Sequence, residues 1–142
     1  MPNRDLNDLH PDLLPLAKQF LDKCKDAGLD ILVTCTYRSP EEQAADYTIG
    51  RTVSLGRRPI TNAQPGQSDH NFTIDGKPAS KAFDIVPMVN GECDWNENSS
   101  TWNDVAKVWR SGIGNSNFWL DWYGKPGAPF HEMPHFCLKE RF

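Results

Sequence analysis

The chain has 142 residues, 38% of them hydrophobic, and a net charge of −4 at pH 7. This length suffices for one domain with its own core. The acidic balance and the lack of a basic patch exclude nucleic acid or an anionic membrane surface as an electrostatic partner. No apolar run could span a membrane, and the first residues lack the apolar core of a signal peptide. We therefore expect a chain that stays in the cytoplasm without stable membrane association.

The first elements are predicted to be scaffold. Apolar residues recur at helical spacing from about Asp12 to Ala27, with Asp12 as the N-cap and Gly28 just beyond the C-terminal end. The β-branched run from Ile31 to Thr36 predicts a strand. Cys24 and Cys35 occupy apolar positions and are expected to be buried as small hydrophobic side chains.

A second, shorter helix is predicted directly after this strand. Ser39 and Glu42 have the spacing of a capping box, and Pro40 occupies the first helical position, where its missing N–H is not needed. The helix is expected to end near Ile49. The following segment, 50–67, contains several Gly and Pro residues without periodicity, which predicts a long loop that serves a site.

Arg38 lies at the junction between the predicted strand and helix, where a side chain is held rigidly at the mouth of a cleft. It could form a surface ion pair, or it could be a bidentate clamp for a substrate carboxylate. Gln43 follows one turn into the helix and is expected to project toward the same cleft.

A metal site is predicted around Asp84. The run Ala82–Val86, ended by Pro87, reads as a buried strand with this carboxylate in its middle. A buried carboxylate is costly unless a cation or hydrogen-bond donors satisfy it. A metal is the obvious cation, and His70 upstream is the natural second ligand. Asp75 competes as a ligand, but its Asp-Gly sequence predicts a turn, whereas Asp84 has the rigid support of a strand.

The third ligand is expected near the end of the chain, at His135, in a segment that reads as an edge strand because of Pro134. One carboxylate and two histidines are the ligand set of a catalytic zinc with an open fourth position. Glu132 is placed by a turn to act as the general base. His131 is left without an assigned role, and Cys137 is either a metal neighbour or a packed thiol.

The segment between these ligands holds further elements. Asp94, Asn96 and Asn98 imitate the start of a calcium loop, but the glycine and glutamate that such a loop needs are missing. Ser100 or Thr101 is expected to cap a helix from Trp102 to Arg110. An aromatic cluster that should form core or cleft wall follows: Phe118, Trp119, Trp122 and Tyr123.

Taken together, the motifs resemble those of the M15 zinc peptidases, the D-alanyl-D-alanine carboxypeptidase/VanY superfamily. Within it the chain is most similar to single-domain phage endolysins of the L-alanyl-D-glutamate endopeptidase type. The resemblance spans nearly the whole chain. It is carried by six pieces in family order: Tyr37-Arg38-Ser39 with Gln43, Gly50-Arg51-Thr52, Thr61-Asn62-Ala63, Ser68-x-His70, Ala82-x-Asp84 and Glu132-x-Pro134-His135-Phe136.

The resemblance implies a role for each matching residue. His70, Asp84 and His135 correspond to the ligands of one Zn²⁺ per chain, and Glu132 corresponds to the catalytic base. Arg38 corresponds to an arginine that holds the substrate or its oxyanion, and the implied substrate-binding residues are Arg38, Gln43 and Ser68.

Two departures from the family pattern bear on these roles. The spacing between His70 and Asp84 is twice the one common in the family, which indicates an inserted turn. The base is Glu132, as in the carboxypeptidases, whereas many of the endopeptidases have aspartate there.

The implied fold is a small α+β domain over residues 1–142, with a central antiparallel sheet, helices packed on one side and zinc in a cleft, but no separate wall-binding domain. The implied substrate is the stem peptide of peptidoglycan, cut at the L-Ala–D-Glu bond during host lysis. A D,D-carboxypeptidase or D-Ala-D-Ala dipeptidase, and a non-catalytic module that binds wall peptides, are the alternatives. The resemblance further implies a monomer that accumulates in the host cytoplasm and reaches the wall after a separate pore-forming protein opens the membrane.

Overall fold

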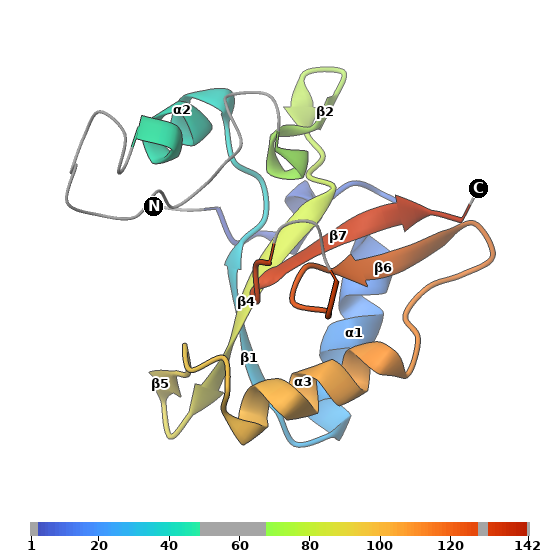
Figure 1. Ribbon diagram of the computed structural model, residues 1–142. Coiled ribbons are helices and arrows are strands. Elements are labelled where there is room, and N and C mark those ends of the chain that lie inside the picture. Colours follow the sequence, from blue (N-terminus) through green and yellow to red (C-terminus); the bar gives the residue numbers. More distant parts are fainter. Residues whose placement is uncertain (1–2, 49–67, 128–130, 142) are drawn as a thin grey trace.

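The computed structural model describes residues 3–48, 68–127 and 131–141. Its centre is an antiparallel sheet with the strand order β1-β4-β7-β6, to which β5 adds beside β4 (Figure 1). The sheet strands are β1 (Asp30–Cys35), β4 (Ala82–Val89), β5 (Glu92–Cys93), β6 (Phe118–Trp122) and β7 (His135–Glu140). The other elements are η1 (Leu6–Asp8), α1 (Leu14–Asp26), α2 (Pro40–Thr48), η2 (Asp69–Asn71), β2 (Thr73–Ile74), β3 (Lys77–Pro78) and α3 (Ser100–Arg110).

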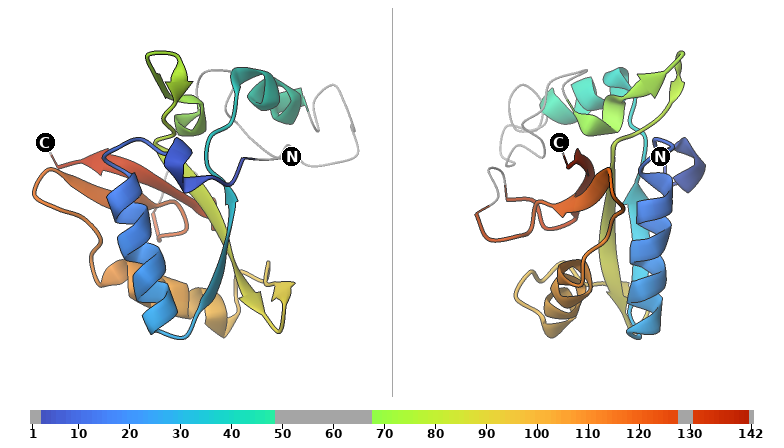
Figure 2. Two further views of the ribbon diagram at one scale, coloured as in Figure 1. Left: turned by 180° about the vertical axis from the view of Figure 1, so that it is seen from behind. Right: turned by 90° about the vertical axis from the view of Figure 1, so that its right-hand side faces the viewer.

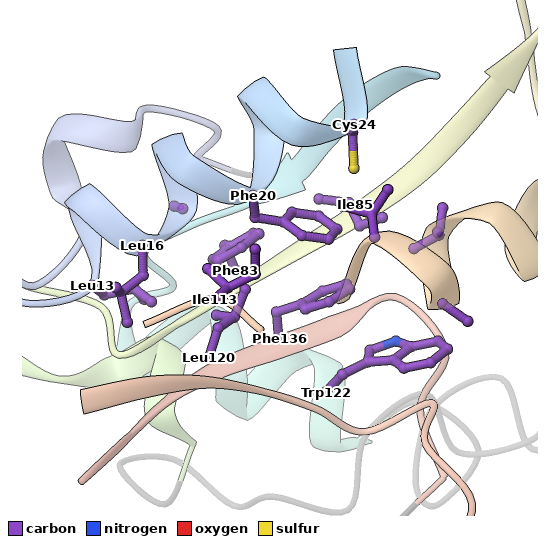
Figure 3. Packing of buried hydrophobic residues seen from close by; sticks show 14 of the residues in the cluster. Leu13, Leu16, Phe20, Cys24, Phe83, Ile85, Ile113, Leu120, Trp122 and Phe136 are labelled. Carbon is purple, nitrogen blue, oxygen red and sulfur yellow. The ribbon is translucent and has the colours of Figure 1, made fainter. Parts of the chain in front are cut away.

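The helices α1 and α3 share one hydrophobic core with the sheet (Figure 3). At its centre the Phe136 ring stacks on Phe83 at a centroid distance of 5.5 Å and on Trp122 at 5.9 Å. Phe20 of α1 packs onto Phe136 from the helix side at 4.7 Å. These buried aromatic residues contribute much of the apolar area that stabilises the fold. The predicted α+β architecture, an antiparallel sheet with helices, is confirmed.

α2 and the β2–β3 hairpin lie together at one end of the molecule, while α3 lies at the other (Figures 1 and 2). Among the described residues, no helix has the length and apolar character needed to cross a bilayer.

Two helix starts differ from the prediction. α1 begins at Leu14 rather than near Asp12, because His10 organises the preceding residues into a turn: its carbonyl oxygen accepts from Leu13 N and its Nδ1 accepts from Asp12 N. α3 begins at Ser100, two residues before the predicted start at Trp102, because Ser99 is its N-cap and accepts from the backbone N–H of Trp102. The C-terminal end of α1 agrees with the prediction, since Gly28 has a φ of +80°.

The prediction that Pro87 ends its strand is wrong, because β4 continues to Val89. Ile85 donates its N–H to the carbonyl oxygen of Pro134, on the β7 side of the strand. Two residues later the nitrogen of Pro87 faces the same side, beyond the end of β7, where no ladder bond is required.

The prediction of an edge strand at His135 is also wrong. β7 lies inside the sheet, because β4 pairs with its first three residues and β6 pairs along Phe136–Glu140. Pro134 does not prevent this arrangement, since it precedes the strand and contributes only a carbonyl oxygen.

Candidate metal centre and active site

The central pair of strands places Asp84 and His135 directly opposite each other. Phe83 and Phe136, one position away on each strand, pack into the core. Because side chains alternate between the two faces of a sheet, Asp84 and His135 both lie on the face opposite the core. The polar side chains therefore meet on a rigid surface whose underside is closely packed.

His70 reaches this face from η2. Ser68 caps η2 by accepting from the N–H of His70 at 3.1 Å, and Asn71 completes a capping box. Nδ1 of His70 lies 2.6 Å from the carbonyl oxygen of Thr36, which can only accept, so Nδ1 carries the ring proton. Nε2, the nitrogen whose lone pair becomes available when the ring is neutral, lies 3.2 Å from Oδ1 of Asp84.

Both histidines converge on one carboxylate oxygen, since Nδ1 of His135 lies 3.1 Å from the same Oδ1 of Asp84. Burial acts to lower the pKa of His70, but the charge and hydrogen bond of Asp84 more than offset this and raise the pKa to about 10. Burial acts to raise the pKa of Asp84, but the two histidines hold it well below its usual range. In the metal-free protein an imidazolium and a carboxylate therefore form a partly buried ion pair.

Arg38 is fixed beside this pair at the junction of β1 and α2, as predicted. Its Nη2 lies 3.9 Å from Oδ2 of Asp84, and its Nη1 donates to Oε1 of Gln43 at 2.9 Å. Its backbone is bonded to η2 on both sides, because Arg38 N donates to His70 O at 2.9 Å and Asn71 Nδ2 donates to Arg38 O at 2.7 Å. The guanidinium is therefore rigidly held at the rim of the site.

Two of the predicted substrate-binding residues, Gln43 and Ser68, have structural contacts within the site. Gln43 is fully buried, with no exposed surface, and positions Arg38. It points toward the guanidinium of Arg38, and its part in substrate binding stays a prediction. The hydroxyl of Ser68 is used to cap η2. Both residues lie within the site's framework rather than on an open wall.

Glu132 belongs to the turn that leads into β7. Its N–H donates to Tyr123 O at 3.1 Å, and its carbonyl oxygen accepts from His135 N at 3.2 Å, which closes the turn. Its side chain is 43% exposed, and Oε2 lies 3.9 Å from Nδ1 of His135. This is the one predicted site residue whose charged group faces solvent while remaining next to the histidines. His131 is exposed.

Other predicted features fall outside the centre. Asp75 lies at the tip of the β2–β3 hairpin with a φ of +52° and is exposed, as a turn residue should be. The carboxylate of Asp94 accepts from Asn96 N and Ser99 Oγ, so it organises the start of α3. Residues 50–67, including the motifs Gly50-Arg51-Thr52 and Thr61-Asn62-Ala63, lie outside the described part of the chain.

Two groups of potential metal ligands occur in the described ranges, each with its ligand atoms within 4.8 Å of one another: Cys35, His70 and Asp84, and Asp69, His135 and Cys137. Asp84 Oδ1 connects the groups because it contacts both histidines. Cys35 was expected only to be buried. Its Sγ lies 3.9 Å from Nδ1 of His70 and accepts from Arg38 at 3.7 Å. Sequence reasoning missed this neighbour because its position also suits a core residue.

The arrangement suits a zinc ion. Two imidazole nitrogens and one carboxylate oxygen, each with a lone pair directed at a common region, are ligands that zinc uses in catalytic sites. A cation at this point would also compensate the buried charge of Asp84. The hydrogen bond from Nδ1 of His70 to Thr36 O is the outer contact that metal-binding histidines usually have.

Solved structures show the class of fold. The crystal structure of the L-Ala D-Glu endopeptidase ChiX from Serratia marcescens matches with a TM-score of 0.58 and 20% identity, over 98% of this chain and 89% of that one. The vancomycin resistance D,D-dipeptidase VanXYg matches with a TM-score of 0.56 and 18% identity, over 94% of this chain and 51% of that one. Both likenesses concern the fold.

A curated relative shows the family. The peptidoglycan L-alanyl-D-glutamate endopeptidase CwlK of Bacillus subtilis (strain 168) is 31% identical over 129 residues, which cover 87% of this chain and 72% of CwlK. The chain therefore belongs to the M15 zinc peptidases, as its motifs predicted, and is a metallopeptidase. No family model matches it.

Proposed function

We propose that this chain is a zinc-dependent peptidoglycan peptidase that cuts the stem peptide at the L-Ala–D-Glu bond. The observation that carries the proposal is the convergence of His70 Nε2 and His135 Nδ1 on Asp84 Oδ1, with the Glu132 carboxylate next to the same His135 nitrogen. The substrate and bond are supported by CwlK and ChiX, which are both named as L-Ala–D-Glu endopeptidases.

His70, Asp84 and His135 would hold the metal. Bound zinc would lower the pKa of a water to near neutral pH. It would also polarise the scissile carbonyl. Oε2 of Glu132 accepts the proton of the attacking water and returns it to the leaving nitrogen. Its exposure and its distance of 3.9 Å from His135 Nδ1 suit a group that must exchange protons without being a ligand.

Arg38 would bind the substrate. Its guanidinium is positioned by Gln43 and partly compensated by Asp84, yet the side chain retains 18% exposure. A fixed guanidinium can donate two parallel hydrogen bonds to a carboxylate or stabilise the oxyanion that forms at the attacked carbonyl. The stem peptide offers both, because D-Glu carries a free carboxylate next to the bond to be cut.

A second candidate is a D,D-carboxypeptidase or dipeptidase on the same site. The fold of the D,D-dipeptidase VanXYg and the glutamate at position 132 both favour it. The two functions differ in the bond that is cut, and they need the same ligands and the same base.

Digestion of purified peptidoglycan, followed by mass spectrometry with and without a zinc chelator, tests the proposal. We expect chelator-sensitive release of peptides that begin at D-Glu, with L-Ala left on the glycan. Loss of terminal D-Ala alone would instead establish the second candidate. No cleavage by zinc-loaded protein would contradict both.

The proposed biological role is host lysis by a phage endolysin that acts as a monomer. This part is supported by the resemblance of the motifs to single-domain endolysins. It predicts that the chain, when produced inside Gram-negative cells, lyses them only if a separate pore-forming protein is also produced. Lysis without a pore former would contradict the dependence on a partner.

A further inference from the structure

His135 has two ring nitrogens, and the metal centre uses one of them. Nδ1 lies 3.1 Å from Asp84 Oδ1, on the ligand side. A histidine that offers the lone pair of Nδ1 carries its proton on Nε2, and that N–H needs an acceptor to fix the tautomer and the ring orientation. His70 has such an acceptor on its outer nitrogen, the carbonyl oxygen of Thr36 at 2.6 Å.

Asp69 offers a carboxylate that can meet this requirement. One of its oxygens, a ring nitrogen of His135 and the Sγ of Cys137 lie within 4.8 Å of one another. Because Nδ1 faces Asp84, Nε2 is the nitrogen that remains for Asp69. No direct hydrogen bond to Nε2 of His135 is present in the described ranges, and a separation of up to 4.8 Å suits one bridging water or a small side-chain rotation.

The same three residues are poorly suited to a second metal ion. Cys137 has no exposed surface, and burial raises the pKa of its thiol to about 12, so it is not a thiolate at neutral pH. Binding through both nitrogens of His135 would also require the ring to lose its second proton. The Tyr123 ring packs on His135 at 4.6 Å, which restricts the ring plane. The cluster therefore suits the orientation of His135 rather than a second ion.

We propose that Asp69 is a positioning residue that accepts the Nε2–H of His135, directly or through one water, and so presents Nδ1 to the metal. This inference rests on the proposed zinc site. Asp69 acts through His135 and touches no reacting atom.

The side chain of Asp69 can be changed without disturbing η2. The cap is made by Ser68 and Asn71, and the contribution of Asp69 to the fold is its backbone carbonyl, which accepts from Lys81 N at 2.9 Å. Asp69→Ala removes the acceptor and Asp69→Asn retains a carbonyl oxygen. Asp104→Ala on α3, where Asp104 forms an exposed ion pair with Lys107, controls for the loss of one negative charge.

The zinc dissociation constant is measured by chelator competition for each variant. We expect it to rise by about 10- to 100-fold in Asp69→Ala, to recover most of the wild-type value in Asp69→Asn, and to stay unchanged in Asp104→Ala. Equal affinities of the wild type and Asp69→Ala would overturn the proposal, provided that both melt at the same temperature.

A measurement on the unmodified protein covers the case in which Asp69→Ala misfolds. Long-range ¹H–¹⁵N spectra of the zinc-loaded protein report which nitrogen of His135 carries the proton. We expect the proton on Nε2, whereas a proton on Nδ1 would overturn the inference while leaving the metal site intact. Histidine signals that do not respond to zinc would overturn the metal site, and this inference with it.

Discussion

Nε2 of His70 lies 3.2 Å from Oδ1 of Asp84, although the two residues are 14 positions apart in the sequence. The intervening β2–β3 strands form a separate hairpin with exposed residues. Ala79 N donates to Phe72 O at 3.0 Å and closes the base of the hairpin. The two ends of the inserted hairpin therefore lie close together. The long spacing does not prevent His70 and Asp84 from meeting at the metal site.

The hairpin supplies a matched control for the ligand assignment. Asp84→Asn should weaken zinc binding by more than about 100-fold, because it removes a ligand rather than an outer contact. Asp75→Asn, at the exposed hairpin tip, should bind zinc like the wild type. Metal content after dialysis against a weak chelator measures both. Zinc loss from Asp75→Asn alone would show that Asp75 is the ligand.

Glu132→Gln separates the base from the ligands. Turnover should fall by about 10²- to 10⁴-fold, because the amide cannot accept the proton of the attacking water. The zinc content should remain at one ion per chain, since the Glu132 side chain is 43% exposed and its Oε2 lies 3.9 Å from His135 Nδ1. Glu140→Gln at the exposed end of β7 is the control. Loss of zinc from Glu132→Gln would make Glu132 a ligand.

The local chemistry of the site could be predicted from the sequence better than its surroundings. A carboxylate within an apolar run identifies one candidate ligand, because it is costly to bury without a cation or hydrogen-bond donors, and His70 and His135 are the histidines that the motifs add to it. Which strands become neighbours is a non-local property. The central position of β7 in the sheet and the presence of Pro87 within β4 both depend on pairing partners that periodicity does not specify.

The outer contacts of the site were the hardest to foresee. Cys35 occupies an apolar position in a strand and gives no sign that it contacts Arg38 and His70. Asp69 precedes a predicted ligand on a short 3₁₀ turn, where it looks like an ordinary loop aspartate. The position of Gln43 one turn into its helix indicates that it points toward the cleft, but not that its carbonyl oxygen holds the guanidinium of Arg38.

The metal-free protein should lose stability as the pH rises above neutral. The pKa of His70 is raised from 6.5 to about 10, so its ion pair stabilises the fold fully below about pH 6.5 and is lost as the pH approaches 10. The pKa of Asp84 is lowered, so its contribution is lost only as the pH falls below its ordinary value of 3.8. Between these limits both contributions are present.

Bound zinc should reverse the slope of stability against pH. The ion competes with the proton on His70, so zinc affinity, and with it the stability of the loaded protein, rises with pH over the same range. Melting temperatures at about pH 6 and about pH 9, in chelator and in excess zinc, measure both slopes. Slopes of the same sign would contradict the assignment of His70 as a ligand. Asp84→Asn, without the ion pair, should lose the metal-free slope.

Arg38→Lys should retain zinc and lose turnover by about 10²- to 10³-fold, because an ammonium group cannot replace the two parallel donors of a guanidinium.

Gln43→Leu should give a smaller loss of kcat, because it removes the acceptor of the hydrogen bond from Nη1 of Arg38. It should also lower the free energy of unfolding by about 1–3 kcal/mol, because a buried polar contact is broken. Gln19→Leu on α1 is the control. Unchanged kcat in Gln43→Leu would mean that Arg38 needs no support.

Gly124→Ala tests how the core supports the turn that carries the base. A Cβ at this position would clash with Cε2 and Cζ2 of Trp122, a buried residue whose ring is stacked on Phe136. The ring cannot move freely, since its Nε1 donates to Met133 O at 2.7 Å, next to Glu132. We expect a loss of about 1–3 kcal/mol in the free energy of unfolding, together with reduced turnover.

The same substitution in a Trp122→Phe background separates this clash from other effects of replacing the glycine. A phenyl ring lacks part of the indole that the new methyl group would contact. The cost of Gly124→Ala should therefore be smaller in Trp122→Phe than in the wild type, when both are measured by denaturant unfolding. Additive costs would mean that the loss does not come from the space beside Trp122.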